Sequence, residues 1–132
     1  MQQKKIFFAI CLAGFLYFLN SCNSRSSTDD NSYSSDTAVI ATGKSLFEKN
    51  CSACHGFRQD GIGPGLGGIT DEVSAEWLYR FIKNSQEMFL SGDDRTVELR
   101  KTFKSVMPPF PALDDDDINA ILAFLHVNKK DL

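Results

Sequence analysis

The sequence predicts an all-α fold for residues 38–132, and two observations support this prediction. Apolar residues recur there at intervals of three to four, the period of a helix surface, and no stretch sustains the period of two that a strand requires. Polar capping residues also precede the periodic segments. A domain of this size is small for a lone hydrophobic core, so disulfides, a metal or a cofactor usually stabilise it.

Residues 1–21 are predicted to be a signal peptide. Lys4 and Lys5 precede an apolar stretch from Ile6 to Leu19. This stretch is shorter than the ~20 apolar residues of a membrane-spanning helix. A charged start followed by a short apolar run is typical of a secretory signal. A short membrane anchor is the alternative.

The four residues Leu19-Asn20-Ser21-Cys22 resemble the end of a bacterial lipoprotein signal. In such lipoproteins the peptide is cut before the cysteine, whose sulfur then carries a diacylglycerol, and two or more acyl chains hold a protein stably on a membrane. The resemblance implies a lipid anchor on Cys22 and a location in the cell envelope, facing the periplasm. A secreted protein cut near the same place is the alternative.

Residues 22–37 are predicted to be the lipidated cysteine and a disordered tether. Asn23 to Thr37 contain no aliphatic residue and are dominated by Ser, Asp and Asn. They therefore bury too little apolar surface to fold. A chain of this length spans about 20 Å root-mean-square and about 50 Å when stretched.

Two helices are predicted in the first half of the domain. The first starts at Asp36 or Thr37, and its apolar face consists of Ile40, Gly43, Leu46 and Phe47. The second follows the N-cap Ser74 and ends near Asn84. Its apolar face consists of Leu78, Phe81 and Ile82, with Val73 and Leu78 as a hydrophobic staple.

Two more helices are predicted in the second half. A weaker one runs from Asp94 to Lys104, and the last follows the N-cap Asp114. Aspartates at 115–117 lie in its first turn, where the helix dipole favours negative charge. They are therefore predicted to start a helix and not to bind calcium, because no oxygen ligands are spaced as in a calcium loop. The apolar stripe consists of Ile118, Ile121, Leu122 and Leu125, and Lys129 and Lys130 close the helix.

The segment Cys51-Ser52-Ala53-Cys54-His55 has the pattern C-x-x-C-H, which indicates covalent haem attachment. Two thiols three residues apart at a helix end can each form a thioether with one vinyl group of a porphyrin edge, and His55 then points its imidazole at the iron. Three alternatives exist. A thioredoxin-like pair needs a βαβ pattern, a structural zinc site needs further ligands, and a plain disulfide needs an oxidising compartment.

From Ala38 to the C-terminus the sequence resembles a class I monohaem cytochrome c. Besides C-x-x-C-H, it has the family's Gly-x-x-x-aromatic pattern at Gly43 and Phe47, with Ile121 and Phe124 at the matching places of the last helix. The resemblance implies a small cytochrome c fold, in which roughly four to five helices wrap around one covalently bound haem c and its iron. It also implies that Gly43 lets the first and last helices approach closely.

The resemblance extends to the iron ligands. The family's Gly-Pro-x-Leu segment is matched around Pro64, whose carbonyl is expected to accept a hydrogen bond from the ring N–H of His55. Met107 precedes two prolines just before the last helix, where the family places the second axial ligand, and His/Met ligation raises the reduction potential. Met88, His126 or an open sixth site are the alternatives. Met88 is expected to pack in the core and His126 to face solvent.

The predicted function is electron transfer and not catalysis. With both axial positions filled by the protein, no substrate binds the iron, and the sequence has no triad or phosphate loop. The expected partners are a quinol-oxidising complex or dehydrogenase as donor and a terminal oxidase or reductase as acceptor. The alternatives are a fixed haem subunit of a larger oxidoreductase complex, and a haem enzyme or gas sensor with an open sixth site.

The charges of the sequence indicate less about its function than the motifs do. A formal net charge of -3 does not favour nucleic-acid binding. Four basic residues before Met107 either steer an acidic partner or form a solvated helix face: Arg95, Arg100, Lys101 and Lys104. Trp77 is expected either to contact the haem or to pack as a core aromatic.

Overall fold

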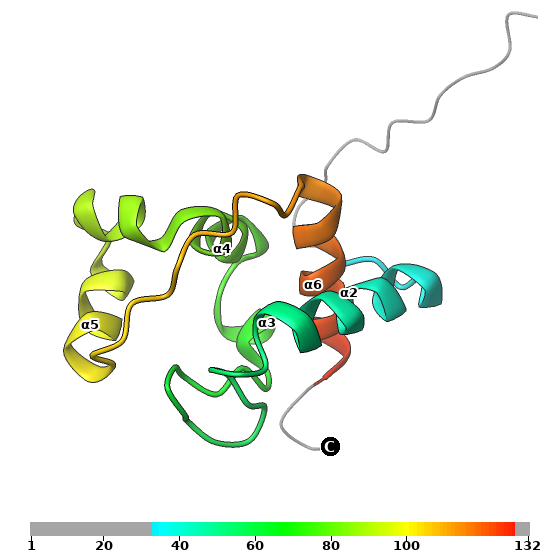
Figure 1. The fold of residues 1–132 in the computed structure, drawn as a ribbon, viewed down its shortest axis with the longest axis horizontal. Helices are drawn as coiled ribbons and strands as arrows, with labels where there is room; N and C mark the ends of the chain where they lie inside the picture. The colour runs from blue at the N-terminus through cyan, green and yellow to red at the C-terminus, as the bar shows by residue number, and fades with distance from the viewer. Residues whose placement is uncertain (1–32, 129–132) are drawn as a thin grey trace, which may run out of the picture.

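The computed structural model describes residues 33–128, which contain helices and no strand, so the all-α prediction is confirmed. These residues form the helices α2 (Thr37–Asn50), α3 (Ile69–Glu72), α4 (Ala75–Leu90), α5 (Asp94–Thr102) and α6 (Asp115–Val127), which are labelled in Figure 1. None of these helices is both long enough and apolar enough to cross a membrane. The predicted signal peptide, the anchor at Cys22, most of the tether and both Lys129 and Lys130 lie outside the described residues.

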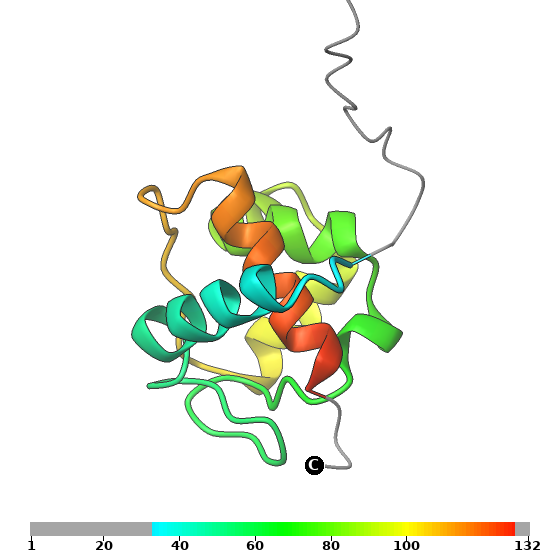
Figure 2. The ribbon, with the colours of Figure 1, turned by 90° about the vertical axis from the view of Figure 1, so that its right-hand side faces the viewer.

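The last helix, α6, forms the centre of the core. It packs against α2, α3 and α4, and α2 crosses in front of it in Figure 2. All four residues of its predicted apolar stripe are buried. Because α6 is apolar around most of its circumference from Ile118 to Leu125, it is stable only when other helices surround it.

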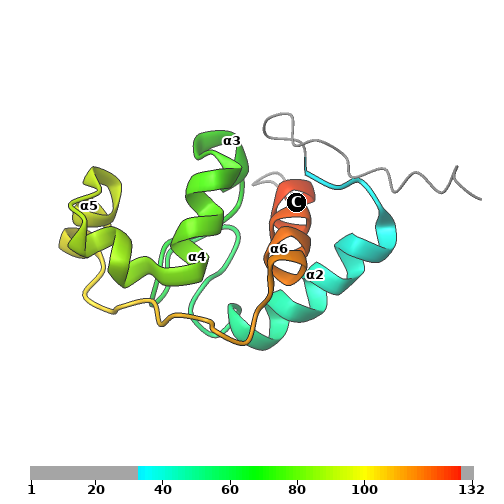
Figure 3. The same cartoon turned by 90° about the horizontal axis from the view of Figure 1, so that it is seen from above.

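The crossing of α2 over α6 is visible from above in Figure 3. Gly43 lies against the backbone of Ala120, and a Cβ at Gly43 would collide with the Ala120 carbonyl oxygen. One turn further along α2, Phe47 packs on Phe124 with ring centroids 5.4 Å apart. The predicted close approach of these two helices is therefore confirmed.

The predicted N-caps of three helices are also confirmed. Asp36 accepts a hydrogen bond from the Ala38 N–H at 2.8 Å, and Ser74 caps α4 in the same manner. At α6, the Asp114 and Asp117 side chains accept from each other's backbone N–H groups in a capping box.

Asp115 has a further role that the sequence does not predict, because it joins α6 to α4. Its Oδ1 accepts hydrogen bonds from the Tyr79 hydroxyl at 2.6 Å and from the Lys83 ammonium at 2.9 Å. These two partners, Tyr79 first, lower the pKa of the Asp115 carboxyl.

Two predicted helix ends differ in the structure, and one short helix was not predicted. The helix predicted to end near Asn84 breaks there, with a non-helical backbone, and then resumes to Leu90. The helix predicted to reach Lys104 ends at Thr102. The sequence does not predict α3, because four residues cannot show a helical period.

The α2–α6 crossing yields a stability prediction. Gly43→Ala should lower the free energy of unfolding of the haem-loaded protein by about 1–3 kcal/mol, because the added methyl overpacks the contact with Ala120. This is opposite in sign to the ~1 kcal/mol that Gly→Ala usually adds inside a helix. Guanidinium denaturation measures the change, and Ser45→Ala on an exposed part of α2 is the control. A stability equal to or above that of the wild type would contradict the packing account.

Candidate functional site

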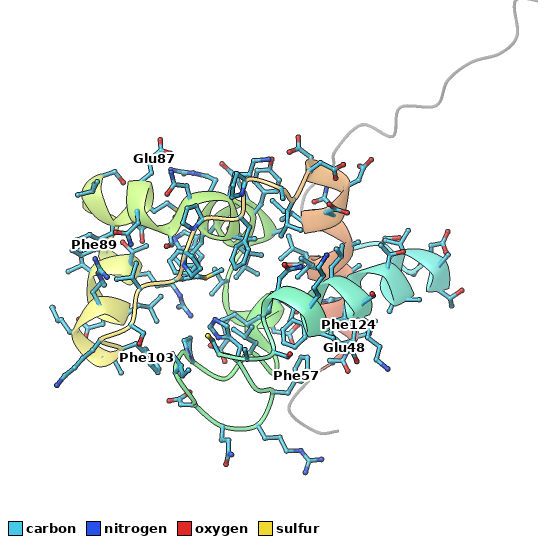
Figure 4. All side chains as sticks on the ribbon, in the orientation of Figure 1. Glu48, Phe57, Glu87, Phe89, Phe103 and Phe124 are labelled. Carbon is cyan, nitrogen blue, oxygen red and sulfur yellow. The ribbon has the colours of Figure 1, made fainter. Side chains whose placement is uncertain are left out.

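A cleft lies between the loop that follows α2, the helices α4 and α5, and the segment that leads from α5 to α6. It encloses about 890 Å³ of empty space, part of it open to solvent, and its walls are mainly apolar. This volume lies within the roughly 300–1,000 Å³ range of cofactor pockets. Figure 4 labels Phe89 and Phe103, which line the cleft at the ends of α4 and α5.

Cys51, Cys54 and His55 form one wall of the cleft. Cys51 is the C-cap of α2, and the chain then turns so that the backbone N–H groups of both Cys54 and His55 donate to the Cys51 carbonyl at 3.0 Å. This turn places both thiols and the imidazole at a single helix end. Neither cysteine forms a disulfide.

The environment of Cys51 does not suit a thiol redox pair. Burial raises the pKa of its thiol to about 11, with a smaller contribution from Cys54. Nucleophilic cysteines in C-x-x-C redox motifs have a lowered thiol pKa instead. The described part of the chain holds no group of three or more His, Cys, Asp and Glu side chains that could bind a metal ion.

The ring of His55 is held on two sides. Its Nδ1 lies 2.8 Å from the carbonyl oxygen of Pro64, as predicted. Because a carbonyl oxygen only accepts hydrogen bonds, Nδ1 is the donor in this contact, and Nε2 is the ring nitrogen that could bind a metal. A Cβ at Gly63 would collide with the imidazole, so only glycine allows the loop to lie this close to the ring.

Met107 lines the same cleft from the segment between α5 and α6. The two alternative ligands do not line it. Met88 is only 3% exposed and packs in the core as expected. His126 is half-buried at the end of α6, where it stacks on Tyr33 with centroids 4.5 Å apart and shares a 3.1 Å hydrogen bond with Thr70. The expectation that His126 faces solvent is therefore wrong.

The basic residues before Met107 occupy different environments. Arg100 lines the cleft and lies over the Phe89 ring, 4.6 Å from its centroid. It is the one lysine or arginine among the described residues that line the cleft, and no aspartate or glutamate lines it. Arg95 lies over the Trp77 ring outside the cleft, and Lys101 pairs with Glu98.

Trp77 lies one layer behind the cleft. Its ring stacks on Phe81, which lines the cleft, with centroids 4.8 Å apart. Its Nε1–H donates to the Asp93 carboxylate at 3.0 Å. Trp77 is therefore a packing residue in this structure and does not line the wall itself.

The described residues fit a haem held through thioethers. The thiols of Cys51 and Cys54, the imidazole of His55 and the side chain of Met107 line one mainly apolar cleft. Gly63 has no side chain that would collide with the imidazole. Sequence reasoning missed part of the wall, notably Ser85 and Phe103. These residues carry no motif and meet the cleft only through tertiary folding.

Comparisons with known proteins agree with this site. The cytochrome c family model matches residues 40–129. The chain is 32% identical over 91 residues to cytochrome c-554(547) of Halothiobacillus neapolitanus, which covers 64% of this chain and 91% of that protein. It is 34% identical over 94 residues to the subunit CcoP of the cbb3-type cytochrome c oxidase of Cereibacter sphaeroides. That match covers 69% of this chain but only 28% of the subunit.

Solved structures show the same fold. The cytochrome c from Rhodothermus marinus superposes with a TM-score of 0.68 at 25% identity, covering 74% of this chain and 82% of that one. The cytochrome c domain of a Pseudomonas putida protein gives a TM-score of 0.57 at 30% identity, covering 64% and 85%. With the family model matching most of the chain and the C-x-x-C-H segment lining a cofactor-sized cleft, the chain belongs to the cytochrome c family and binds haem c covalently.

Proposed function

We propose that this protein is a membrane-tethered electron carrier in which Cys51 and Cys54 hold one haem and His55 and Met107 are its two axial ligands. The observation that carries the proposal is the placement of all four side chains on one cleft. When bound, haem supplies an iron that gains and loses one electron. With protein ligands on both sides, no position is left for a substrate, so the protein carries electrons and is not an enzyme.

The chain's own residues prepare the site for this role. The Pro64 carbonyl and Gly63 fix the orientation of the His55 ring. Pro108 and Pro109 stiffen the backbone next to Met107, which reduces the entropy lost when its side chain is held. The mainly apolar walls limit the contact of the site with water, and burial is one of the properties by which a protein tunes the reduction potential of a haem. Little needs to move between the two oxidation states.

The relatives support two forms of this function. Cytochrome c-554(547) is matched over 91% of its length, which supports a separate small carrier. CcoP is a subunit of a cbb3-type oxidase, and the chain matches little more than a quarter of it, which supports the alternative of a fixed haem subunit in a larger complex. Both forms imply redox proteins as partners. We propose a quinol-oxidising complex or dehydrogenase as donor and a terminal oxidase or reductase as acceptor.

The ligand assignment is tested by the paired substitutions Met107→Leu and Met88→Leu. The oxidised wild type should show the weak long-wavelength band of methionine–Fe(III) ligation, and the reduced wild type should not bind carbon monoxide. Met107→Leu should lose the band and bind carbon monoxide, because its side chain has no sulfur. Met88→Leu makes the same chemical change in the core and should behave as the wild type. Carbon monoxide binding by the wild type would instead favour the enzyme or sensor alternative.

The cation in the cleft yields a prediction about the reduction potential. Arg100→Gln should lower the midpoint potential by some tens of millivolts, because a positive charge near the site favours the reduced, less positive iron. Arg95→Gln removes an equal charge outside the cleft and should have a smaller effect. Equal shifts in the two variants, measured by redox titration at one ionic strength, would show that the location of Arg100 has no special influence.

The proposed tether is tested by its length. Deleting residues 24–31 should slow quinol-dependent electron transfer in native membranes, because a shorter tether restricts the positions that the domain reaches. The absorption spectrum should stay unchanged. The matched control replaces the same eight residues by Gly and Ser, which preserves the length and should preserve the rate. An unaltered rate after the deletion would remove the functional argument for the tether.

A further inference from the structure

The segment 104–112, which carries Met107, has few means of holding its own position. Residues 108, 109 and 111 are prolines, which have no backbone N–H to donate. The segment contains no helix. Among the described residues, the Leu113 N–H donates to the Phe110 carbonyl oxygen at 3.1 Å in a local turn, and the Ser85 hydroxyl of α4 donates to the Met107 carbonyl oxygen at 2.7 Å. Of these two hydrogen bonds, the one from Ser85 connects the segment to a distant element.

Ser85 is well placed to hold this bond. Ser85 is only 4% exposed, and it lines the cleft together with Met107. A buried hydroxyl without a hydrogen-bond partner destabilises the folded state, so breaking the bond between the Ser85 hydroxyl and the Met107 carbonyl oxygen is unfavourable. The bond spans 22 positions of sequence and is therefore a tertiary contact and not a local turn.

The break in α4 explains why a serine reaches this position. At Asn84 the backbone leaves the helix (φ -158°, ψ 86°), and the Asn84 side chain accepts from the Glu87 N–H at 3.2 Å, as an N-cap does. Ser85 is therefore the first residue of a newly started helical segment. Figure 4 labels Glu87 and Phe89 on this segment, beside the segment that leads from α5 to α6.

We propose that Ser85 is a positioning residue for Met107: its hydroxyl pins the Met107 carbonyl and thereby holds the thioether in the cleft. This inference rests on the proposed His55/Met107 ligation. The Ser85 hydroxyl holds the backbone of Met107, and Ser85 belongs to a helical segment that has its own N-cap at Asn84. Loss of the hydroxyl should leave the fold intact but let the ligand leave the iron more often.

The test uses imidazole as a competing ligand for the oxidised, haem-loaded protein. Imidazole binds only when Met107 has left, so its apparent affinity rises in proportion to the open population. Ser85→Ala should raise this affinity about threefold to tenfold, which corresponds to one hydrogen bond, and weaken the long-wavelength band. Ser91→Ala is the matched control, because the Ser91 hydroxyl donates to the Met88 carbonyl at the end of the same helix, away from the segment 104–112.

A second pair of variants separates the hydroxyl from the shape of the side chain. Ser85→Thr and Ser85→Val have nearly the same volume, and any clash in the buried position is common to both. Thr should keep the wild-type imidazole affinity more closely than Val, since Thr alone retains the donor. Equal affinities for Thr and Val, or a Ser85→Ala variant that binds imidazole like the wild type, would overturn the role of Ser85.

The two levels of the proposal fail in different ways. A wild type without the methionine band would overturn His55/Met107 ligation and, with it, the role of Ser85. A wild type with the band and with Ser85 variants that all retain wild-type imidazole affinity would leave the ligation standing and overturn only the positioning role.

Discussion

The contact between Gly43 of α2 and the backbone of Ala120 in α6 is the constraint on which the site depends. The C-terminal end of α2 carries Cys51, and the N-terminal end of α6 receives the segment that carries Met107. Because the two helices cross without an intervening side chain, their directions are fixed, and so are the starting points of both walls of the cleft. The aromatic packing of Phe47 on Phe124 extends the same contact toward the cysteines.

The sequence predicts what local chemistry determines. Capping residues such as Ser74 and Asp114 act through neighbours three residues away, and the Pro64 contact with His55 follows a compact motif. Burial and helix bounds that depend on residues distant in sequence cannot be predicted from local chemistry. His126 is half-buried because Tyr33 covers it, and the helix resumes after Asn84 because a new cap forms there. The place of Ser85 in the cleft could not be predicted either, because nothing in its local sequence specifies a contact 22 positions away.

The comparisons show that one domain type occurs in two settings. Nearly the whole of cytochrome c-554(547) is matched, whereas the same match covers a minor part of CcoP. A domain whose own residues line the cofactor cleft can occur in both settings. The match to this domain alone does not distinguish a mobile carrier from a fixed subunit.

The stacking of Tyr33 on His126 has a mechanical consequence. Tyr33 is the first described residue of the chain, and it contacts the end of α6, whose His126 in turn is bonded to Thr70 in α3. A pull arriving from the N-terminal side therefore acts on Tyr33 and the end of α6 before it acts on α2. None of these three residues lines the cleft. In the tethered arrangement proposed above, load from the anchor would reach this corner of the helical core before it reaches the cysteines at the end of α2.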